Sequence, residues 1–117
     1  FGRAWTVQIY NIGRGAVTTV LRGSAPTMTL AEDGSVTGNA GCNTFRSTYT
    51  VSDTSLTITP AAATRKMCGE PAGIMQQESA FLAALSQVTS YHAEDNTLLL
   101  RGADGAILLL LRPTEAP

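Results

Sequence analysis

Residues 38–45 read Gly-Asn-Ala-Gly-Cys-Asn-Thr-Phe, and residues 64–68, Thr-Arg-Lys-Met-Cys, carry the second of the chain's two cysteines. Cys42 and Cys68 can therefore form one intrachain bridge and no other. An even, minimal cysteine count is typical of a small domain made for an oxidising compartment, such as a bacterial envelope or the extracellular space. The two stretches favour an exported protein.

The spacing of the cysteines favours a structural bridge over a reactive redox pair. Catalytic dithiols usually lie about two residues apart, and Cys42 and Cys68 are much more widely separated. Closing a loop of this length stabilises a fold by about 3–4 kcal/mol in the chain-entropy model. Two buried thiols are the alternative, because the Cα distance that decides between them cannot be read from spacing.

Length and composition indicate one globular domain with no nucleic-acid partner and no membrane span. A chain of 117 residues usually forms one core, and 44% hydrophobic with 15% charged residues excludes disorder. The net charge of −1 does not attract nucleic acid, and the longest apolar run, residues 106–111, is too short to cross a bilayer. We expect a monomeric domain over residues 1–112 and a frayed tail over 113–117.

The first residue is Phe1 rather than methionine. A secretory signal, a lipid-anchored cysteine or a further domain upstream is compatible with this start. The absence of such a segment from the sequence is therefore no evidence for a cytoplasmic location.

Alternating or β-branched segments on both sides of Cys42 predict strands. These segments are residues 5–9, 17–21, 27–30, 35–39, 48–51, 56–59, 90–92, 97–101 and 106–112. Asp33-Gly34 between two of them is a strong hairpin signal. The consecutive apolar residues of 106–112 predict a strand that is covered on both faces.

The period changes after Pro71 and predicts a helix over about residues 74–88. Its apolar positions recur at three- and four-residue spacing, with polar positions on the other side. The first set is Met75, Phe81, Leu82, Leu85 and Val88, with Glu78 on or beside it, and the second is Gln76, Gln77, Ser79 and Gln87. The predicted fold class is α+β: a curved, mostly antiparallel sheet of about seven or eight strands with this helix packed on it.

These patterns together resemble the META domain, the family that includes the HslJ-type heat-shock lipoproteins of bacterial envelopes. That family has an opening tryptophan, a hairpin, Gly-x-x-Gly-Cys-Asn-x-Phe, a nearby tyrosine, Thr-x-x-Met-Cys and a helix that begins Met-x-x-Glu. The matching positions are Trp5, Gly38, Gly41, Cys42, Asn43, Phe45, Tyr49, Thr64, Met67, Cys68, Met75 and Glu78. One position departs: Ser47 stands where the family commonly has glycine, at what we expect to be a turn.

The resemblance implies a compartment and a context rather than a reaction. META domains resemble envelope-associated, stress-linked modules of undetermined biochemical activity, often lipoproteins or parts of secreted proteins. The resemblance therefore leads us to expect a location in the bacterial cell envelope, as a periplasmic protein or an outer-membrane lipoprotein, or secretion. The resemblance implies no enzymatic activity.

Four of the matching residues suggest structural roles. Asn43 is expected to satisfy backbone donors of its own turn, with a ligand cleft as the alternative. Gly38 and Gly41 suggest a strand bulge rather than a phosphate cradle, because no Lys-Ser/Thr follows them. Glu78, close to the helix start, is expected to cap the helix.

No pattern in the sequence points to catalysis, a cofactor or a metal. His92 is the sole histidine and follows Tyr91 in a predicted strand, so a surface imidazole is a simpler account than a dyad with a cysteine. One histidine and two cysteines do not close a zinc site, and the sequence holds no Gly-x-Ser-x-Gly elbow. We expect a protein that is not an enzyme.

The aromatic residues are expected to fill the core: Trp5, Phe45, Tyr49, Phe81 and Tyr91. A curved sheet can leave a groove beside its helix for a hydrophobic or peptide ligand. The sequence thus predicts a stress-linked binding or accessory module with an unknown protein or peptide partner. The alternatives are an envelope inhibitor of a protease or lysozyme, or a purely structural domain of a larger lipoprotein.

Overall fold

The computed structural model describes residues 2–13 and 16–114. In these residues the chain forms ten strands and one helix. The elements are β1 (Ala4–Asn11), β2 (Val17–Thr19), β3 (Thr27–Leu30), β4 (Ser35–Asn39), β5 (Thr44–Ser52), β6 (Ser55–Ile58), β7 (Ala62–Ala63), α1 (Ile74–Gln87), β8 (Ser90–Glu94), β9 (Thr97–Arg101) and β10 (Ile107–Pro113).

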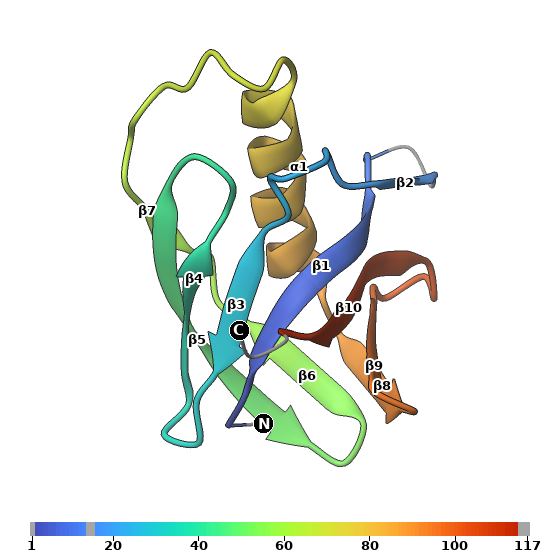
Figure 1. Ribbon diagram of the computed structural model, residues 1–117. Helices are drawn as coiled ribbons and strands as arrows, with labels where there is room; N and C mark the ends of the chain where they lie inside the picture. Colours follow the sequence, from blue (N-terminus) through green and yellow to red (C-terminus); the bar gives the residue numbers. More distant parts are fainter. Residues whose placement is uncertain (1, 14–15, 115–117) are drawn as a thin grey trace.

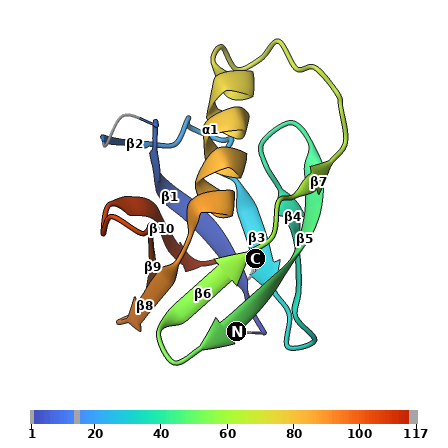
Figure 2. The ribbon, with the colours of Figure 1, turned by 180° about the vertical axis from the view of Figure 1, so that it is seen from behind.

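The strands form an antiparallel sheet that closes into a barrel. Along the sheet the order is β10-β9-β8-β6-β5-β4-β3-β1, and β10 pairs back onto β1 (Figures 1 and 2). Eight strands of the described chain close the barrel, while β2 extends it beside β1 and β7 pairs with β5. The predicted α+β class and mostly antiparallel sheet are confirmed. Closure was not predicted, because it depends on pairing between the two ends of the chain, from Trp5↔Pro113 to Tyr10↔Leu109.

The apolar run of β10 is explained by an irregularity in its pairing with β9. Ile107 pairs with Arg101 and Leu109 pairs with the preceding Leu100, so Leu108 is an extra residue in β10. Leu108 and Leu109 are both buried in the core cluster. A bulge therefore turns two consecutive leucines inward, where strict alternation would place only one.

The helix α1 stands at one end of the barrel, the upper end in Figure 1, and contributes its apolar side to the barrel core. Phe81 and Leu85 are fully buried, and the Phe81 ring meets Phe45 of β5 edge-to-face, with ring centroids 5.5 Å apart. The aromatic residues expected in the core are buried there, except that Tyr91 packs against the core half-buried.

Gln77, expected on the solvent side of α1, is one of its most buried side chains at 1% exposure. Its Oε1 accepts the N–H of Leu21 at 2.7 Å and its Nε2 donates to the Ser24 carbonyl at 2.8 Å. The side chain holds the β2–β3 connection against the helix, since those backbone groups lack partners in the sheet. Hydropathy alone could not show this, because a buried glutamine that bonds to loop backbone groups has the same hydropathy as a glutamine on the surface.

Several boundaries differ from the sequence-based expectation. The strand predicted from residue 48 begins at Thr44, and the helix ends one residue earlier than predicted, at Gln87. Pro113, expected in the tail, is the last residue of β10, and the Thr114 N–H donates to the Ala4 carbonyl. The rest of the predicted tail, residues 115–117, lies outside the described residues.

Across the described ranges, the structure has no helix that is both long and apolar enough to cross a membrane.

Candidate functional site

The turn of residues 40–43, between β4 and β5, is the centre of the candidate site. Gly38, just before it, pairs with Met28 on one side and Phe45 on the other. A Cβ at Gly38 would overlap the Thr27 carbonyl oxygen, so this glycine permits close backbone approach and is not part of a bulge. Gly41 has a φ of +126° and leaves the space that the Ile74 side chain of α1 occupies.

Glu78 reaches from α1 to this turn. Its Oε1 accepts the backbone N–H groups of Cys42 at 2.9 Å and Asn43 at 2.7 Å, and its Oε2 accepts the Asn43 side-chain amide at 2.6 Å. The side chain is 5% exposed. The expectation that Glu78 caps its own helix is wrong: it lies beyond the first turn of α1, and the N-cap Gly73 has no side-chain cap. The carboxylate instead satisfies the donors of a turn in another element.

Asn43 extends this network to a third segment. Its Oδ1 accepts the Thr64 hydroxyl at 2.8 Å and the Lys66 N–H at 2.7 Å, and its Nδ2 also donates to the Lys66 carbonyl at 3.0 Å. The side chain is 2% exposed. Asn43 does satisfy backbone groups, as asparagine in a turn was expected to, but those groups belong to the segment after β7 and not to its own turn.

Cys42 and Cys68 form the disulfide that the sequence predicts, with their Cα atoms 5.9 Å apart. The bridge joins the 40–43 turn to the segment that Asn43 already holds at Lys66. Both sulfur atoms are bonded to each other, so neither cysteine offers a thiolate nucleophile.

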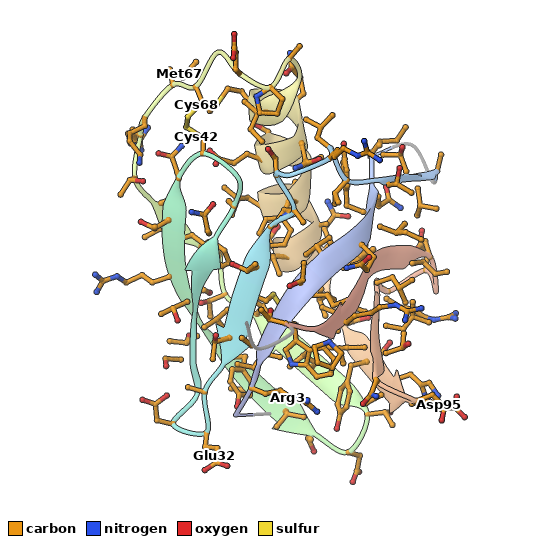
Figure 3. The ribbon with its side chains drawn as sticks, in the orientation of Figure 1. Arg3, Glu32, Cys42, Met67, Cys68 and Asp95 are labelled. Carbon is orange, nitrogen blue, oxygen red and sulfur yellow. A yellow bond between two sulfur atoms is a disulfide. The ribbon has the colours of Figure 1, made fainter. Side chains whose placement is uncertain are left out.

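We call residues 64–70 the stapled loop, because they leave β7 and are fastened at Lys66 by Asn43 and at Cys68 by the disulfide. The loop arches between β7 and α1 at one end of the molecule, with Met67 above Cys68 and Cys42 (Figure 3). Met67 is 83% exposed, whereas the other large apolar side chains described as exposed reach only 42–45%. Arg65 and Lys66, which precede it, are also exposed.

The exposure of Met67 is the feature that sequence reasoning missed. The methionine was recognised as a motif residue, and a methionine beside a cysteine is more often buried than exposed. The available signal was its setting, since Arg65, Lys66 and Glu70 make this the most densely charged stretch around either cysteine.

The remaining motif residues serve the fold. Met75 is half-buried in the first turn of α1. Tyr49 is buried in the core, and its hydroxyl donates to the Ala31 carbonyl at 2.6 Å. Ser47 lies in the middle of β5, paired with Val36, and its hydroxyl contacts Thr59, so the turn expected there is a continuous strand.

His92 lies on β8, at the opposite end of the molecule from the disulfide (Figures 1 and 3). Its side chain is 65% exposed, and its Nε2 is 3.0 Å from the Glu94 carboxylate. The part of the chain that the structure describes has no group of three or more histidine, cysteine, aspartate or glutamate residues placed to hold a metal ion.

A groove runs beside α1, as the curved sheet led us to expect. It consists of two adjoining hollows of about 450 and 320 Å³, which share Asn11, Gln87 and Leu108 in their linings. The Asn11 side chain is already engaged, since its Nδ2 donates to the Ile107 carbonyl at 3.0 Å and its Oδ1 accepts the Gly13 N–H at 2.7 Å. The groove is therefore a shallow surface feature whose buried amide stabilises the strand ends.

Comparison with known proteins gives one family and a set of similar folds. The family model of the META domain matches residues 2–115. A protein from Burkholderia xenovorans, solved by NMR, superposes with a TM-score of 0.75 at 22% identity and covers 98% of this chain and 83% of its own. A DUF4847 family protein from Bacteroides vulgatus, solved by crystallography, superposes with a TM-score of 0.66 at 15% identity, over 99% of this chain and 95% of its own. Among curated proteins, none matches the sequence.

Proposed function

The chain belongs to the META domain family, and from that premise we propose that it is a non-enzymatic binding module that recognises a protein partner through the stapled loop. It works as a stress-linked accessory protein in an oxidising compartment, either the bacterial cell envelope or the extracellular space. The observation that carries the proposal is Met67, 83% exposed on a backbone that is fixed on both sides of it.

A fixed loop is suited to binding because little conformational freedom is left to lose. Lys66 has its N–H and its carbonyl both held by Asn43, and Cys68 is bonded to Cys42. Holding a loop in its bound conformation improves affinity by reducing the ordering cost, which is about 0.5–1.5 kcal/mol for each side chain that binding immobilises. Methionine and arginine are both enriched at protein interfaces, and methionine adapts to irregular apolar pockets.

The contacts of the candidate catalytic groups support the non-enzymatic part of the proposal. The two cysteines are bonded to each other, and His92 faces Glu94 on the surface of β8. The buried polar side chains Glu78 and Asn43 hold backbone groups in place. A nucleophile would need a free side chain next to a base, and these contacts provide none at the site.

The disulfide supports the proposed compartment. Bridges of this kind persist in the periplasm or outside the cell, and are rare where thiols are kept reduced. The Cys42–Cys68 bridge supports an exported location, whether the protein is anchored to the envelope or free.

A second candidate is an inhibitor of an envelope hydrolase, either a protease or a lysozyme. The same loop favours it, since inhibitors of hydrolases commonly present a rigid loop to the enzyme. The two candidates differ in the effect of binding: an inhibitor lowers the activity of the hydrolase that it binds, whereas an accessory module does not.

Site-specific photo-crosslinking tests the proposal. A photoreactive amino acid replaces Met67 in one variant and the exposed Thr57 of β6 in the control. With an envelope extract, we expect a defined adduct at position 67 that excess wild-type protein abolishes and excess Met67→Asp variant does not. Equal labelling at both positions, or labelling that the Met67→Asp protein also abolishes, would contradict binding through the loop. If the captured partner is a hydrolase whose activity falls with added wild-type protein, the inhibitor is the correct candidate.

A further inference from the structure

We propose that Met67 is an oxidative modification site, at which a peroxide or hypochlorous acid converts the thioether to methionine sulfoxide ahead of every other sulfur atom in the chain. The inference rests on how the fold distributes its sulfur atoms. It does not require the partner to be known.

The chain has five sulfur-containing residues, two cysteines and three methionines. Cys42 and Cys68 are bonded to each other, so no thiol competes for the oxidant. Met28 is 1% exposed in the barrel core and Met75 is half-buried in α1, whereas Met67 is 83% exposed. Since oxidation follows access to the sulfur atom, the fold leaves Met67 as the first target.

The chemistry needs only the named oxidant. The Met67 sulfur attacks one oxygen of hydrogen peroxide, an S–O bond forms and the O–O bond breaks, and after proton transfer the second oxygen leaves as water. Sulfur gives up two electrons and the peroxide accepts them. With hypochlorous acid the O–Cl bond breaks instead, and chloride and a proton are released. An oxidising compartment is where such species reach a protein without a cytoplasmic reducing pool to intercept them.

The modification leaves the fold intact, because the loop is held by backbone groups and by the bridge. Asn43 binds the Lys66 backbone, and the disulfide fastens Cys68, while the Met67 side chain lies in solvent. What changes is the chemistry of the exposed group, from a flexible apolar thioether to a polar sulfoxide. The consequence for binding rests on the proposed function: the polar sulfoxide weakens the contact of residue 67 with an apolar pocket of the partner. Reduction of the sulfoxide by methionine sulfoxide reductase restores that contact.

The test is limited oxidation of the native protein with hydrogen peroxide, followed by proteolytic peptide mapping for the mass of one added oxygen atom. We expect Met67 to be oxidised several-fold faster than Met75 and Met28. In Met67→Leu the rapid phase disappears, and in the matched control Met75→Leu it is unchanged. In denaturant all three methionines of the wild type react at similar rates, which shows that the fold creates the difference.

Oxidation of Met75 or Met28 as fast as Met67 in the native protein would overturn the site. So would a singly oxidised protein that unfolds at a lower temperature than the untreated one, because the sulfoxide would then disturb packing. Peptide mapping of the oxidised protein requires no partner. A failure to crosslink at position 67 would therefore refute the proposed function and leave the oxidation result unchanged.

Discussion

The two turns that flank strand β4 differ in what holds them together. At one end, residues 31–34 join it to β3, and at the other, residues 40–43 join it to β5. The first turn, beside the label of Glu32 in Figure 3, is formed mainly by its own residues. The second, at Cys42, is held by residues of the stapled loop and of α1. The comparison shows where a sequence specifies local structure and where the rest of the fold has to supply it.

The 31–34 turn is held mainly by hydrogen bonds between neighbouring residues. The Asp33 Oδ1 accepts the Ser35 N–H at 2.9 Å and the Ser35 hydroxyl at 2.7 Å, and the Ala31 N–H donates to the Ser35 carbonyl at 2.9 Å. Gly34 has a φ of +93°, which a glycine adopts without strain. All of these partners lie within four residues, so the Asp-Gly step is enough to predict the hairpin.

The 40–43 turn depends on distant residues. The N–H groups of Cys42 and Asn43 are accepted by Glu78, and the Cys42 sulfur is bonded to Cys68. Removing the Glu78 carboxylate leaves these buried N–H donors unpaired, which costs more than an exposed hydrogen bond provides. The two turns should therefore respond differently to substitution.

Removal of the disulfide should give the largest effect. The double variant Cys42→Ala/Cys68→Ala frees a loop with a sequence separation of 26 residues, and we expect its free energy of unfolding to fall by about 3–4 kcal/mol. Urea denaturation followed by circular dichroism measures this. The control is the wild type in reductant, which should approach the variant, while the variant itself does not respond to reductant. A loss below about 1 kcal/mol would mean that Glu78 and Asn43 hold the turn without the bridge.

Glu78→Gln should give the next largest effect. A glutamine has one acceptor oxygen, and its NH₂ group would face the Asn43 amide, which now donates to Oε2 at 2.6 Å. Loss of a hydrogen bond to a charged acceptor at a buried position leads us to expect a decrease in unfolding free energy of about 2 kcal/mol. The matched control is Glu70→Gln in the exposed stapled loop, which should be close to neutral.

The two changes should also be coupled, because both the bridge and the carboxylate hold Cys42. In a double-mutant cycle, we expect the loss caused by Glu78→Gln to differ between the bridged protein and the Cys42→Ala/Cys68→Ala protein by about 0.5 kcal/mol or more. Strict additivity would show that the bridge and the carboxylate act independently, contrary to the contacts at this turn.

How much could be predicted from sequence follows the same division. The strand pattern, the helix and the Asp33-Gly34 hairpin were predictable because periodicity and turn chemistry act over a few residues. The roles of Glu78 and Gln77 were not, since each satisfies backbone groups of a segment far away in the sequence. The bridge itself was predictable only because two cysteines allow a single pairing. Closure of the barrel depends on the assembled fold and leaves no local pattern. The exposure of Met67 depends on it too, and its only local signal is the charged residues around it, Arg65, Lys66 and Glu70.

Tyr49→Phe tests a long-range side-chain contact of the 31–34 turn and leaves in place the hydrogen bond from the Tyr49 backbone N–H to the Gly34 carbonyl. Its hydroxyl donates to the Ala31 carbonyl at 2.6 Å, and we expect the substitution to lower the free energy of unfolding by about 1 kcal/mol at neutral pH. Burial first, and then the carboxylates of Asp33 and Glu32, raises the pKa of Tyr49 above its ordinary value of 10.0. Because the pKa of Tyr49 is higher in the folded than in the unfolded protein, its contribution to the free energy of unfolding is complete at pH values below the ordinary pKa. This contribution is lost as the pH rises through the folded pKa. The gap between wild type and variant in urea denaturation should therefore narrow above about pH 10, and a gap that widens there would contradict the assignment.

Asp33→Asn should give the smallest effect, because the asparagine oxygen can still accept from Ser35 and the turn is local. Hydrogen bonds from the Ser35 hydroxyl and then from its backbone N–H hold the pKa of Asp33 below its ordinary value of 3.8. For a lowered pKa, the stabilisation is present above the ordinary value and is lost as pH falls through the folded pKa. We expect the thermal midpoints of the two proteins to coincide at neutral pH, and the midpoint of the wild type to fall more steeply than that of the variant as the pH drops to about 3. Calorimetry at both pH values measures the difference, and the remaining carboxylates are common to the two proteins and cancel. If the thermal midpoints of the two proteins fall in parallel as the pH drops, the Asp33 carboxylate is bonded no better in the folded turn than in the unfolded chain. If the midpoint of Asp33→Asn is already lower at neutral pH, the turn needs the charge of Asp33 as well as its acceptor oxygen.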